Sequence, residues 1–485
     1  MNFINPDKHT RRAFLRRSSQ LAMAGTALPF ALNLAAIGEA AAFNATDYRA
    51  LVCVFLLGGN DYANTVVTYD DPSYNLYNTI RGGSAGQGAG GIALAKSALT
   101  PTLLNPTTPL AGGRQYALHP SMGGMANLFN SGRAAVQLNV GPLIVPLTLA
   151  QYNSSNRTLF PLPPKLFSHN DQQSVWQSSQ SEGSTVGSGG NMGDLALSSN
   201  TNSLFTCISA SGNSVFLSGD SALQYQVGNN GAVAITSVTS GVYGSNAVRD
   251  AMNTLVQQPR SHVLENEYNR ITSRSIGAQG QITSALNTVT LNTAFPAGNS
   301  LADQLRVVAR LIGARNNLGA RRQVFFVSLG GFDLHDNLID NQPTQLGRVS
   351  DAMTAFYNAT VELGVANQVT AFTASDFGRT LTSNGDGSDH GWGSHHFMVG
   401  GAVRGRAFYG TPPPVTNTVS GAPENQFHVG QGRLLPTTAV DQYVATLARW
   451  FGVEDGELAG VLPNINRFGA VAGRPDYPTN LGFMA

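Results

Sequence analysis

The chain has 485 residues, a formal net charge of +1, and only 12% charged residues. Its length suits one large domain with insertions or two or three ordinary domains, and its near-neutral balance provides no basic face for nucleic acid. The two cysteines have neither zinc-finger nor redox spacing. Cys53 lies in an apolar run and is expected in the core, with a disulfide to Cys207 as a minor alternative.

The N-terminus has the pattern of an export signal. Thr10–Arg16 reads TRRAFLR, close to the twin-arginine motif, and a mildly apolar segment follows over 21–37. Small residues at Ala40–Ala42 suit a signal peptidase, so we predict a signal peptide over 1–42. A membrane anchor is disfavoured because the segment is short and is interrupted by Pro29. We expect a periplasmic or otherwise exported protein that does not span the membrane once processed.

The mature chain opens with a predicted buried strand. Leu51 to Leu57 is continuously apolar, as expected of a strand covered on both faces. Glycines at 58 and 59 allow a tight turn, which places Asp61 just beyond the strand's carboxyl end. Open α/β sheets bind ligands at that edge, although a helix N-cap is an alternative role for this aspartate. Ser73–Gly91, rich in tyrosine, glycine and serine, is interpreted as a surface excursion.

The next third of the chain is less regular. A short helix is predicted near 121–130 and a strand over 134–140. Ser168 is a candidate nucleophile, and it could equally cap the helix that begins near Gln172. From 178 to about 300 the composition turns to Ser, Asn, Gly and Thr, and we interpret this region as a cap or insertion over the core.

Core periodicity returns after residue 300. The pattern predicts strands and helices over Leu301–Leu318 (helix), Gln323–Leu329 (strand), Leu346–Val361 (helix), Gln368–Ala374 (strand), Phe397–Val403 (strand) and Leu434–Phe451 (helix). Strands that alternate with helices predict an α/β protein with a mostly parallel central sheet and helices on both faces. We expect a single domain over 43–485.

Acidic and imidazole side chains follow three of these strands. The carboxyl ends of parallel strands meet at one edge, so these groups should converge. Aspartate and histidine together suit zinc, magnesium, manganese or calcium. The predicted ligands are Asp61, Asp333, His335, Asp376 and His390. For His395 and His396, a role in the core or behind the ligands is as strongly expected as a functional role.

Several stretches resemble domain-of-unknown-function family 1501. They read LVCVFLLGGND, LFSHNDQQSVW, FFVSLGGFDLHDN, TASDFGRTLTSNGDGSDHGWGSHHFMVGGAVRG and LPTTAVDQYVATLARWFGV. The twin-arginine signal fits that family too. The family resembles the alkaline phosphatase and sulfatase superfamily in fold, which implies an alkaline-phosphatase-like domain.

The superfamily resemblance also implies roles for individual residues. A metal-binding aspartate follows the first strand, as Asp61 does, and the nucleophile stands at a helix start, as Ser168 does. A later strand end gives aspartate and histidine, matched by Asp333 and His335, and the final histidine is matched by His390, with His395 as a rival.

One position departs from the superfamily pattern. After Asp376 the superfamily carries a histidine, whereas this chain has Phe377, so one imidazole is lost. A lost ligand leaves one coordination shell incomplete, so we expect about one equivalent of metal or less, and one metal, a different metal or no metal all stay open. A single cation is expected between Asp61 and Asp376, with Ser168 nearby. The other position would rely on Asp333, His335 and His390, whose spacing is atypical.

Two functions compete on these grounds. The first is a metal-dependent hydrolase of phosphate or sulfate esters, on small molecules or polymers, in which Ser168 attacks and Arg379 binds the substrate oxyanion. The second is a non-catalytic binding or assembly protein with a degenerate site, because a fold does not fix a function. A metal-free serine hydrolase is disfavoured because the chain lacks a GxSxG elbow.

Overall fold

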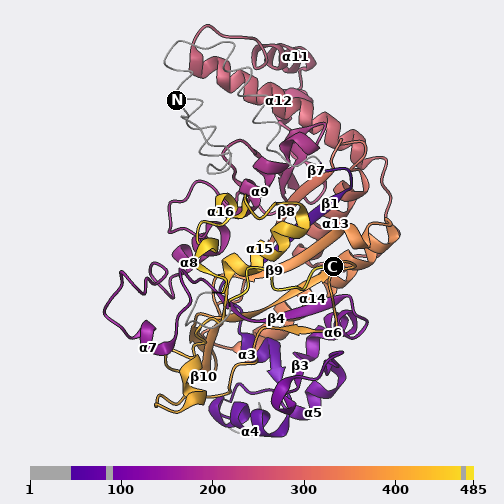
Figure 1. Ribbon diagram of the computed structural model, residues 1–485. Helices are drawn as coiled ribbons and strands as arrows, with labels where there is room; N and C mark the ends of the chain where they lie inside the picture. The colour runs from indigo at the N-terminus through magenta and orange to yellow at the C-terminus, as the bar shows by residue number, and fades with distance from the viewer. Residues whose placement is uncertain (1–44, 84–90, 471–476) are drawn as a thin grey trace.

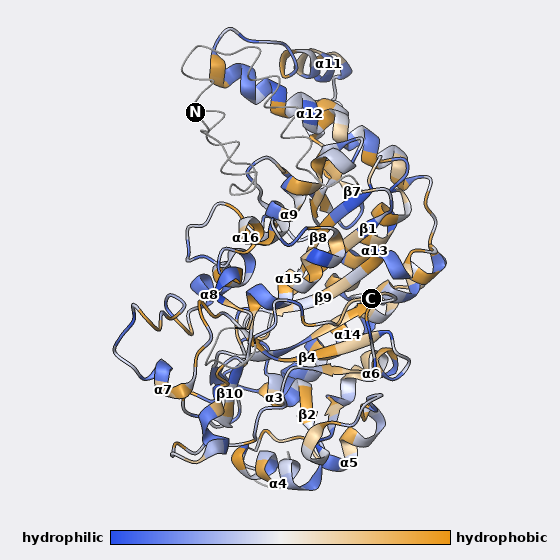
Figure 2. Ribbon diagram, in the orientation of Figure 1, coloured by the Kyte–Doolittle hydropathy of each residue, from blue (hydrophilic) through white to orange (hydrophobic). Residues whose placement is uncertain are grey.

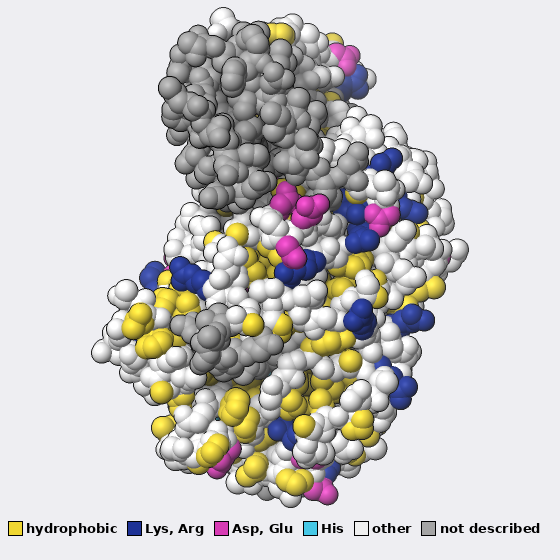
Figure 3. Space-filling model, in the orientation of Figure 1, with side chains coloured by type: hydrophobic (Ala, Val, Ile, Leu, Met, Phe, Trp, Pro, Cys, Tyr) yellow, Lys and Arg dark blue, Asp and Glu magenta, His cyan; other side chains and the backbone are white. Residues whose placement is uncertain are grey.

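The computed structural model describes residues 45–83, 91–470 and 477–485 (Figure 1). The predicted signal peptide lies outside these ranges. Within them, no helix has both the length and the apolar character that crossing a bilayer requires. Figure 3 shows charged side chains scattered over the viewed face.

A ten-stranded sheet forms the centre of the fold, in the order β13-β4-β12-β9-β1-β8-β5-β6-β7, with β14 paired to β4. The strands are β1 (Arg49–Leu56), β4 (Ala134–Gly141), β5 (Cys207–Ser209), β6 (Gln224–Gly228), β7 (Gly231–Ala232), β8 (Arg322–Leu329), β9 (Val369–Ser375), β12 (Ser394–Gly400), β13 (Phe408–Tyr409) and β14 (Thr438–Ala439). The run from β6 to β9 is parallel, whereas β12 is antiparallel to both of its neighbours. The prediction of a mostly parallel sheet is confirmed, with this reversed strand as the main exception.

Helices cover both faces of the sheet. The sequence of β1 is continuously apolar because its side chains are buried on both faces. Ala50, Val52 and Val54 belong to the core on one face, and Leu51, Cys53 and Phe55 to the core on the other. The first core includes α6 (Gly123–Asn130), α13 (Ser300–Gly313) and α14 (Leu338–Glu362); the second includes α9 (Ser188–Ala196) and α15 (Val440–Phe451). Figure 2 shows hydrophobic residues concentrated on the central strands.

The prediction of a surface excursion over Ser73–Gly91 was wrong for residues 73–80, which belong to a helix. Helix α4 spans Asp71–Ile80 and begins after Asp70, whose side chain accepts a hydrogen bond from the Ser73 backbone N–H at 3.1 Å. Tyr77 is 1% exposed and packs in a small separate core. The tyrosines here are therefore core residues on one helix face.

The region 178–300 has two structural parts. Strands β5 to β7 extend the central sheet beyond β8. Helix α11 (Asn246–Leu255) and the first half of α12 (Val263–Leu286) project at one end of the molecule (Figure 1). Cys53 and Cys207 are both buried and unpaired, so the alternative of a disulfide is not realised.

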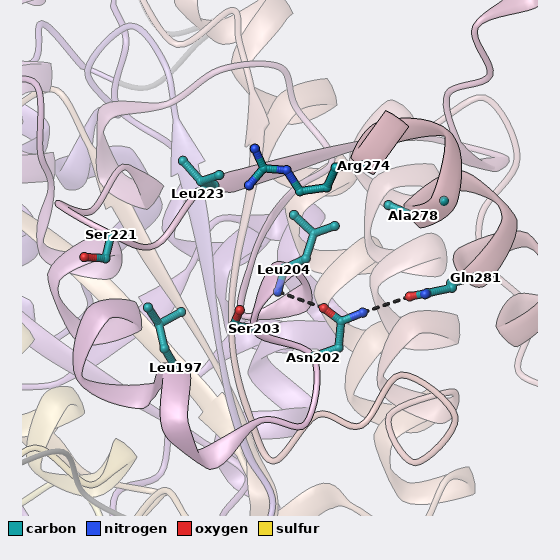
Figure 4. A pocket seen from close by; sticks show the side chains of 10 residues that line it. Leu197, Asn202, Ser203, Leu204, Ser221, Leu223, Arg274, Ala278 and Gln281 are labelled. Atoms are coloured by element: carbon teal, nitrogen blue, oxygen red, sulfur yellow. Dashed lines mark hydrogen bonds between the residues drawn. The ribbon is translucent and has the colours of Figure 1, made fainter. Parts of the chain in front are cut away.

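The second half of α12 is anchored to the body. A pocket of about 370 Å³ lies where they meet, and Leu197, Leu204 and Leu223 are among the residues that line it. The Asn202 side-chain amide donates a hydrogen bond to Gln281 Oε1 on α12 at 2.8 Å (Figure 4).

Asp441 makes the stability of the fold dependent on pH. It is 2% exposed in the first turn of α15, and it accepts hydrogen bonds from Ser179 Oγ and the Asn464 backbone N–H, both at 3.1 Å. Burial raises the pKa of Asp441 to about 7. Because the folded pKa lies above the unfolded value, the native state is favoured at acidic pH and loses stability as pH rises through 7.

We therefore expect Asp441→Asn to gain stability over the wild type as pH rises. The difference in the free energy of unfolding should grow by about 2–3 kcal/mol between pH 5 and pH 8. Urea unfolding at both pH values measures it. Stability profiles that run parallel for the two proteins would contradict this assignment.

Candidate metal centre

The centre is built where β1, β8 and β9 end side by side. Leu56, at the end of β1, pairs with Leu329 of β8 and Ser375 of β9. The loops that follow are in close contact: the backbone N–H of Gly58 donates to Asp376 Oδ1 at 3.2 Å. A Cβ at Gly58 would lie 2.4 Å from a backbone nitrogen, and its φ of +117° also favours glycine.

Two histidines and an aspartate converge at this edge. His169 is the first residue of α8 (His169–Ser178), Asp333 follows β8, and His390 ends the short strand β11 (Ser388–His390). Their ligand atoms all lie within 4.8 Å of one another. The Nε2 atoms of His169 and His390 are 3.4 and 3.3 Å from the Asp333 carboxylate. Both Nε2 atoms are buried and have no hydrogen-bond partner.

The other ring nitrogen of each histidine is held by a neighbour. His169 Nδ1 lies 2.6 Å from Asp376 Oδ2, and His390 Nδ1 lies 2.7 Å from the Phe167 carbonyl oxygen. Asp376 is fully buried and also accepts a hydrogen bond from Gln173 Nε2 at 2.9 Å. Donation from each Nδ1–H leaves each Nε2 with a lone pair, the arrangement typical of metal-binding histidines.

The charges of the three groups suit a cation. Burial alone would raise the pKa of Asp333, but the hydrogen bond and charge of Arg379 lower it overall. Burial lowers the pKa of His390, which keeps this imidazole neutral and able to bind a metal. The hydrogen bond to Asp376 raises the pKa of His169, so a cation competes there with a proton.

Two imidazoles and one carboxylate fit zinc better than the all-oxygen shells of magnesium or calcium. Bonds of 2.0–2.1 Å in a tetrahedron place ligand atoms about 3.3 Å apart, close to the two nitrogen–carboxylate distances described above. Catalytic zinc sites use three protein ligands and keep one position open. The Asp333 side chain is 43% exposed, so the centre can be reached from solvent. The predicted ligand His335 lies beside this group, with its Nδ1 3.0 Å from Asp333 Oδ1.

Phe377 packs against both His169 and His390. Its ring centroid lies 4.8 Å from that of His169 and 4.6 Å from that of His390. Gly59 makes room for it, because a Cβ there would lie 2.4 Å from the Phe377 ring. The residue at the position of the expected histidine therefore packs an apolar ring against two imidazoles.

Asp61 lies outside this cluster. One carboxylate oxygen accepts hydrogen bonds from Arg81 NH2 and Ser388 Oγ, both at 2.7 Å, and the other accepts from the Asn64 backbone N–H at 3.0 Å. It caps the short helix α3 (Tyr62–Thr65), the alternative role that the sequence allowed. The cluster in the structure therefore differs from the predicted cation site between Asp61 and Asp376, because a buried arginine neutralises the first carboxylate and His169 engages the second.

Arg379 also has a different environment from the one predicted. It is fully buried, and its NH1 donates to Asp333 Oδ1 at 2.6 Å and to the Gly58 carbonyl at 3.3 Å. Its NH2 donates to the Ser388 carbonyl. The guanidinium thus orients Asp333, and these contacts occupy the donors that were expected to bind a substrate oxyanion.

Ser168 lies next to the centre along the chain. It precedes α8, between Phe167, which binds His390, and His169 itself. Its hydroxyl donates to Asp171 Oδ2 at 2.8 Å and makes no hydrogen bond to the helix backbone. Its role as a nucleophile stays a prediction.

The two consecutive histidines of β12 lie in the interior. His395 Nδ1 accepts a hydrogen bond from the Asn139 backbone N–H at 3.1 Å, and His396 packs edge-on against Trp176. Burial lowers the pKa of each to about 3, so both are neutral core residues.

Sequence reasoning missed His169. It comes from a helix more than 160 residues before Asp333 in the chain, and only the folded sheet edge brings the two together. One local signal existed: His169 and Gln173 are four residues apart, on one face of α8, and both contact Asp376.

The profile of a family described as "Protein of unknown function (DUF1501)" matches residues 48–462. The chain belongs to this family. None of the curated proteins matches the chain. Among solved structures, the PsFucS1 sulfatase from Pseudoalteromonas sp. is similar at a TM-score of 0.34 and 8% identity, over 84% of this chain and 68% of that one. The alkaline phosphatase from the Antarctic bacterium TAB5 has a TM-score of 0.29 and 9% identity, over 75% and 95%. These likenesses are distant and carry no argument about function.

Proposed function

We propose that this DUF1501 protein is an exported, metal-dependent hydrolase of phosphate or sulfate esters, with one divalent cation, preferably zinc. One observation carries the proposal: the buried Nε2 atoms of His169 and His390 face the Asp333 carboxylate and have no hydrogen-bond partner. A buried polar atom without a partner is costly, and a cation would satisfy both imidazoles at once.

The residues divide the work as follows. His169, His390 and Asp333 hold the cation, and Asp376, Arg379 and the Phe167 carbonyl orient them. A bound divalent cation polarises an ester oxygen and lowers the pKa of a hydroxyl or water. The Ser168 hydroxyl attacks the phosphorus or sulfur atom, Asp171, its hydrogen-bond acceptor, takes the proton, and the bond to the leaving alcohol breaks. Water then hydrolyses the serine ester, which releases phosphate or sulfate and restores the Ser168 hydroxyl. His335, which is 39% exposed beside Asp333, is placed to protonate a leaving group.

Hydrolysis of nitrophenyl phosphate and nitrophenyl sulfate tests the activity. The zinc-loaded mature protein should hydrolyse one of them, and chelation should abolish turnover. Ser168→Ala should lower kcat at least about 10³-fold and leave the metal content unchanged. The exposed Ser155→Ala is the matched control and should keep full activity.

A binding or assembly protein without turnover is the second candidate. The observation that favours it is the inward position of Arg379, whose donors are occupied by protein groups. Zinc bound at about one equivalent, together with no hydrolysis of either ester, would support this candidate over the hydrolase.

Export by the twin-arginine route completes the proposal. It rests on Arg11 and Arg12, followed by the small residues Ala40–Ala42. Replacing both arginines with lysine should leave an unprocessed precursor in the cytoplasm, visible by immunoblotting of cell fractions. Normal processing of the double variant would count against this route.

A further inference from the structure

Helix α12 has an apolar stripe along its whole length, but only its second half is covered. The stripe follows a heptad spacing, interrupted by one serine: Leu264, Tyr268, Ile271, Ser275, Ala278, Ile282 and Ala285. The last three are buried. The first three project with the helix and are 74%, 66% and 49% exposed. The uncovered half therefore has the pattern of a helix that packs against another helix.

Exposed apolar side chains are concentrated around this projecting part. Of the fourteen large hydrophobic residues that are exposed in the described chain, six lie on α11 or on the first half of α12: Val248, Leu255, Val263, Leu264, Tyr268 and Ile271. Helix α11 contributes no buried residue. The side-chain amide of Asn269 donates to the carbonyls of Leu255 and Gln258, which ties the end of α11 to α12. Such a concentration on a monomer marks an interaction surface.

The charged residues beside the stripe favour a second copy of α12 as the partner that covers it. Glu267 immediately precedes Tyr268 of the stripe, and Arg274 immediately precedes Ser275 of the stripe. Because the two charged residues are seven positions apart, they lie on the same side of the stripe. Residues on this flank form the interhelical ion pairs of coiled coils. If two α12 helices pair antiparallel, with Tyr268 against Ile271 of a second copy, Glu267 of each copy approaches Arg274 of the other. Two-fold symmetry forms this pair twice.

Other occupants fit less well. Among the described residues, Glu267 forms an ion pair with Arg270 of its own helix at 3.0 Å. This pair is exposed and contributes little to stability, so Glu267 can instead pair with a second copy. Acidic and basic residues are mixed along the helix, so an anionic lipid surface would gain little from it.

We propose that the protein forms a symmetric dimer through antiparallel pairing of the first half of α12, residues 263–275. This inference is independent of the proposed hydrolase, because the surface shares no residue with the metal centre.

Sedimentation of the mature full-length protein tests the dimer. The wild type should be dimeric at tens of micromolar, and Tyr268→Glu with Ile271→Glu should be monomeric with an unchanged circular dichroism spectrum. The matched control is Val419→Glu, at a site that is 75% exposed elsewhere on the surface, which should remain dimeric. A monomeric wild type, or a double variant that stays dimeric, overturns the proposal.

Charge reversal tests the register. Glu267→Arg alone and Arg274→Glu alone should each weaken the dimer about 5- to 30-fold, because each places like charges together twice. The combined variant should restore the wild-type dissociation constant, which loss of helix stability would not do. Failure of the combination to restore dimerisation excludes the antiparallel register.

Discussion

Replacing His169 with alanine should remove the metal ion from the protein. The wild type, dialysed against zinc and then against metal-free buffer, should retain about one equivalent by elemental analysis. His169→Ala and His390→Ala each delete one of three ligands and should weaken binding at least about 100-fold, beyond the 10–100-fold typical of residues behind the ligands. Added zinc should raise the Tm of the wild type and leave both variants unchanged.

Two further variants make this test specific. Asp376→Asn should lower zinc affinity by about 10–100-fold only, because Asp376 acts through His169 Nδ1. The matched control is His262→Ala, an exposed histidine that precedes α12, and it should bind zinc as the wild type does. Full zinc retention by His169→Ala would disprove the centre as described.

Replacing Asp61 with asparagine should destabilise the protein without removing the metal. Asp61 and Arg81 form an ion pair at 2.7 Å, with side chains 2% and 0% exposed. Breaking such a pair leaves an uncompensated buried charge and costs about 3–5 kcal/mol in the free energy of unfolding. Urea unfolding, followed alongside zinc content, distinguishes this structural role from the ligand role that the sequence suggested.

An exposed ion pair provides the control. Asp71 pairs with Lys96 and its side chain is 84% exposed, so Asp71→Asn should cost about 0–1 kcal/mol. If Asp61→Asn does not fold, Asp61→Leu combined with Arg81→Met should recover much of the loss, because no buried charge then remains. Loss of zinc with unchanged stability in Asp61→Asn would instead make Asp61 a ligand.

The central strands were predictable because a strand that is buried on both faces has a continuous run of apolar residues. Leu51 to Leu57 and Gln323 to Leu329 are almost continuously apolar, and both form strands within a residue or two of the prediction. Helix α4 was not predicted, because its tyrosines were interpreted as part of a surface excursion. In the fold, the Tyr77 hydroxyl donates to Asn64 Oδ1 at 2.6 Å, so a polar contact stabilises a ring that is otherwise buried.

The edge of the sheet was predictable, but the chemistry of each group there was not. Sequence position placed Asp333, Asp376 and His390 after strands, and the structure brings them to one edge. Which carboxylate meets a cation depends on contacts between distant segments. Arg81 lies 20 residues from Asp61, and Asp376 lies 207 residues from His169.

The central position of β1 has a consequence for synthesis of the protein. Ala50 pairs with Gln323 on one side and with Val369 on the other. The first strand therefore leaves the ribosome about 270 residues before its nearest partner, a delay of roughly 15–55 s at bacterial or eukaryotic elongation rates. During that time its apolar residues have no sheet to join, and unpaired apolar strands aggregate. We infer that the nascent chain depends on chaperones until β8 and β9 have been translated.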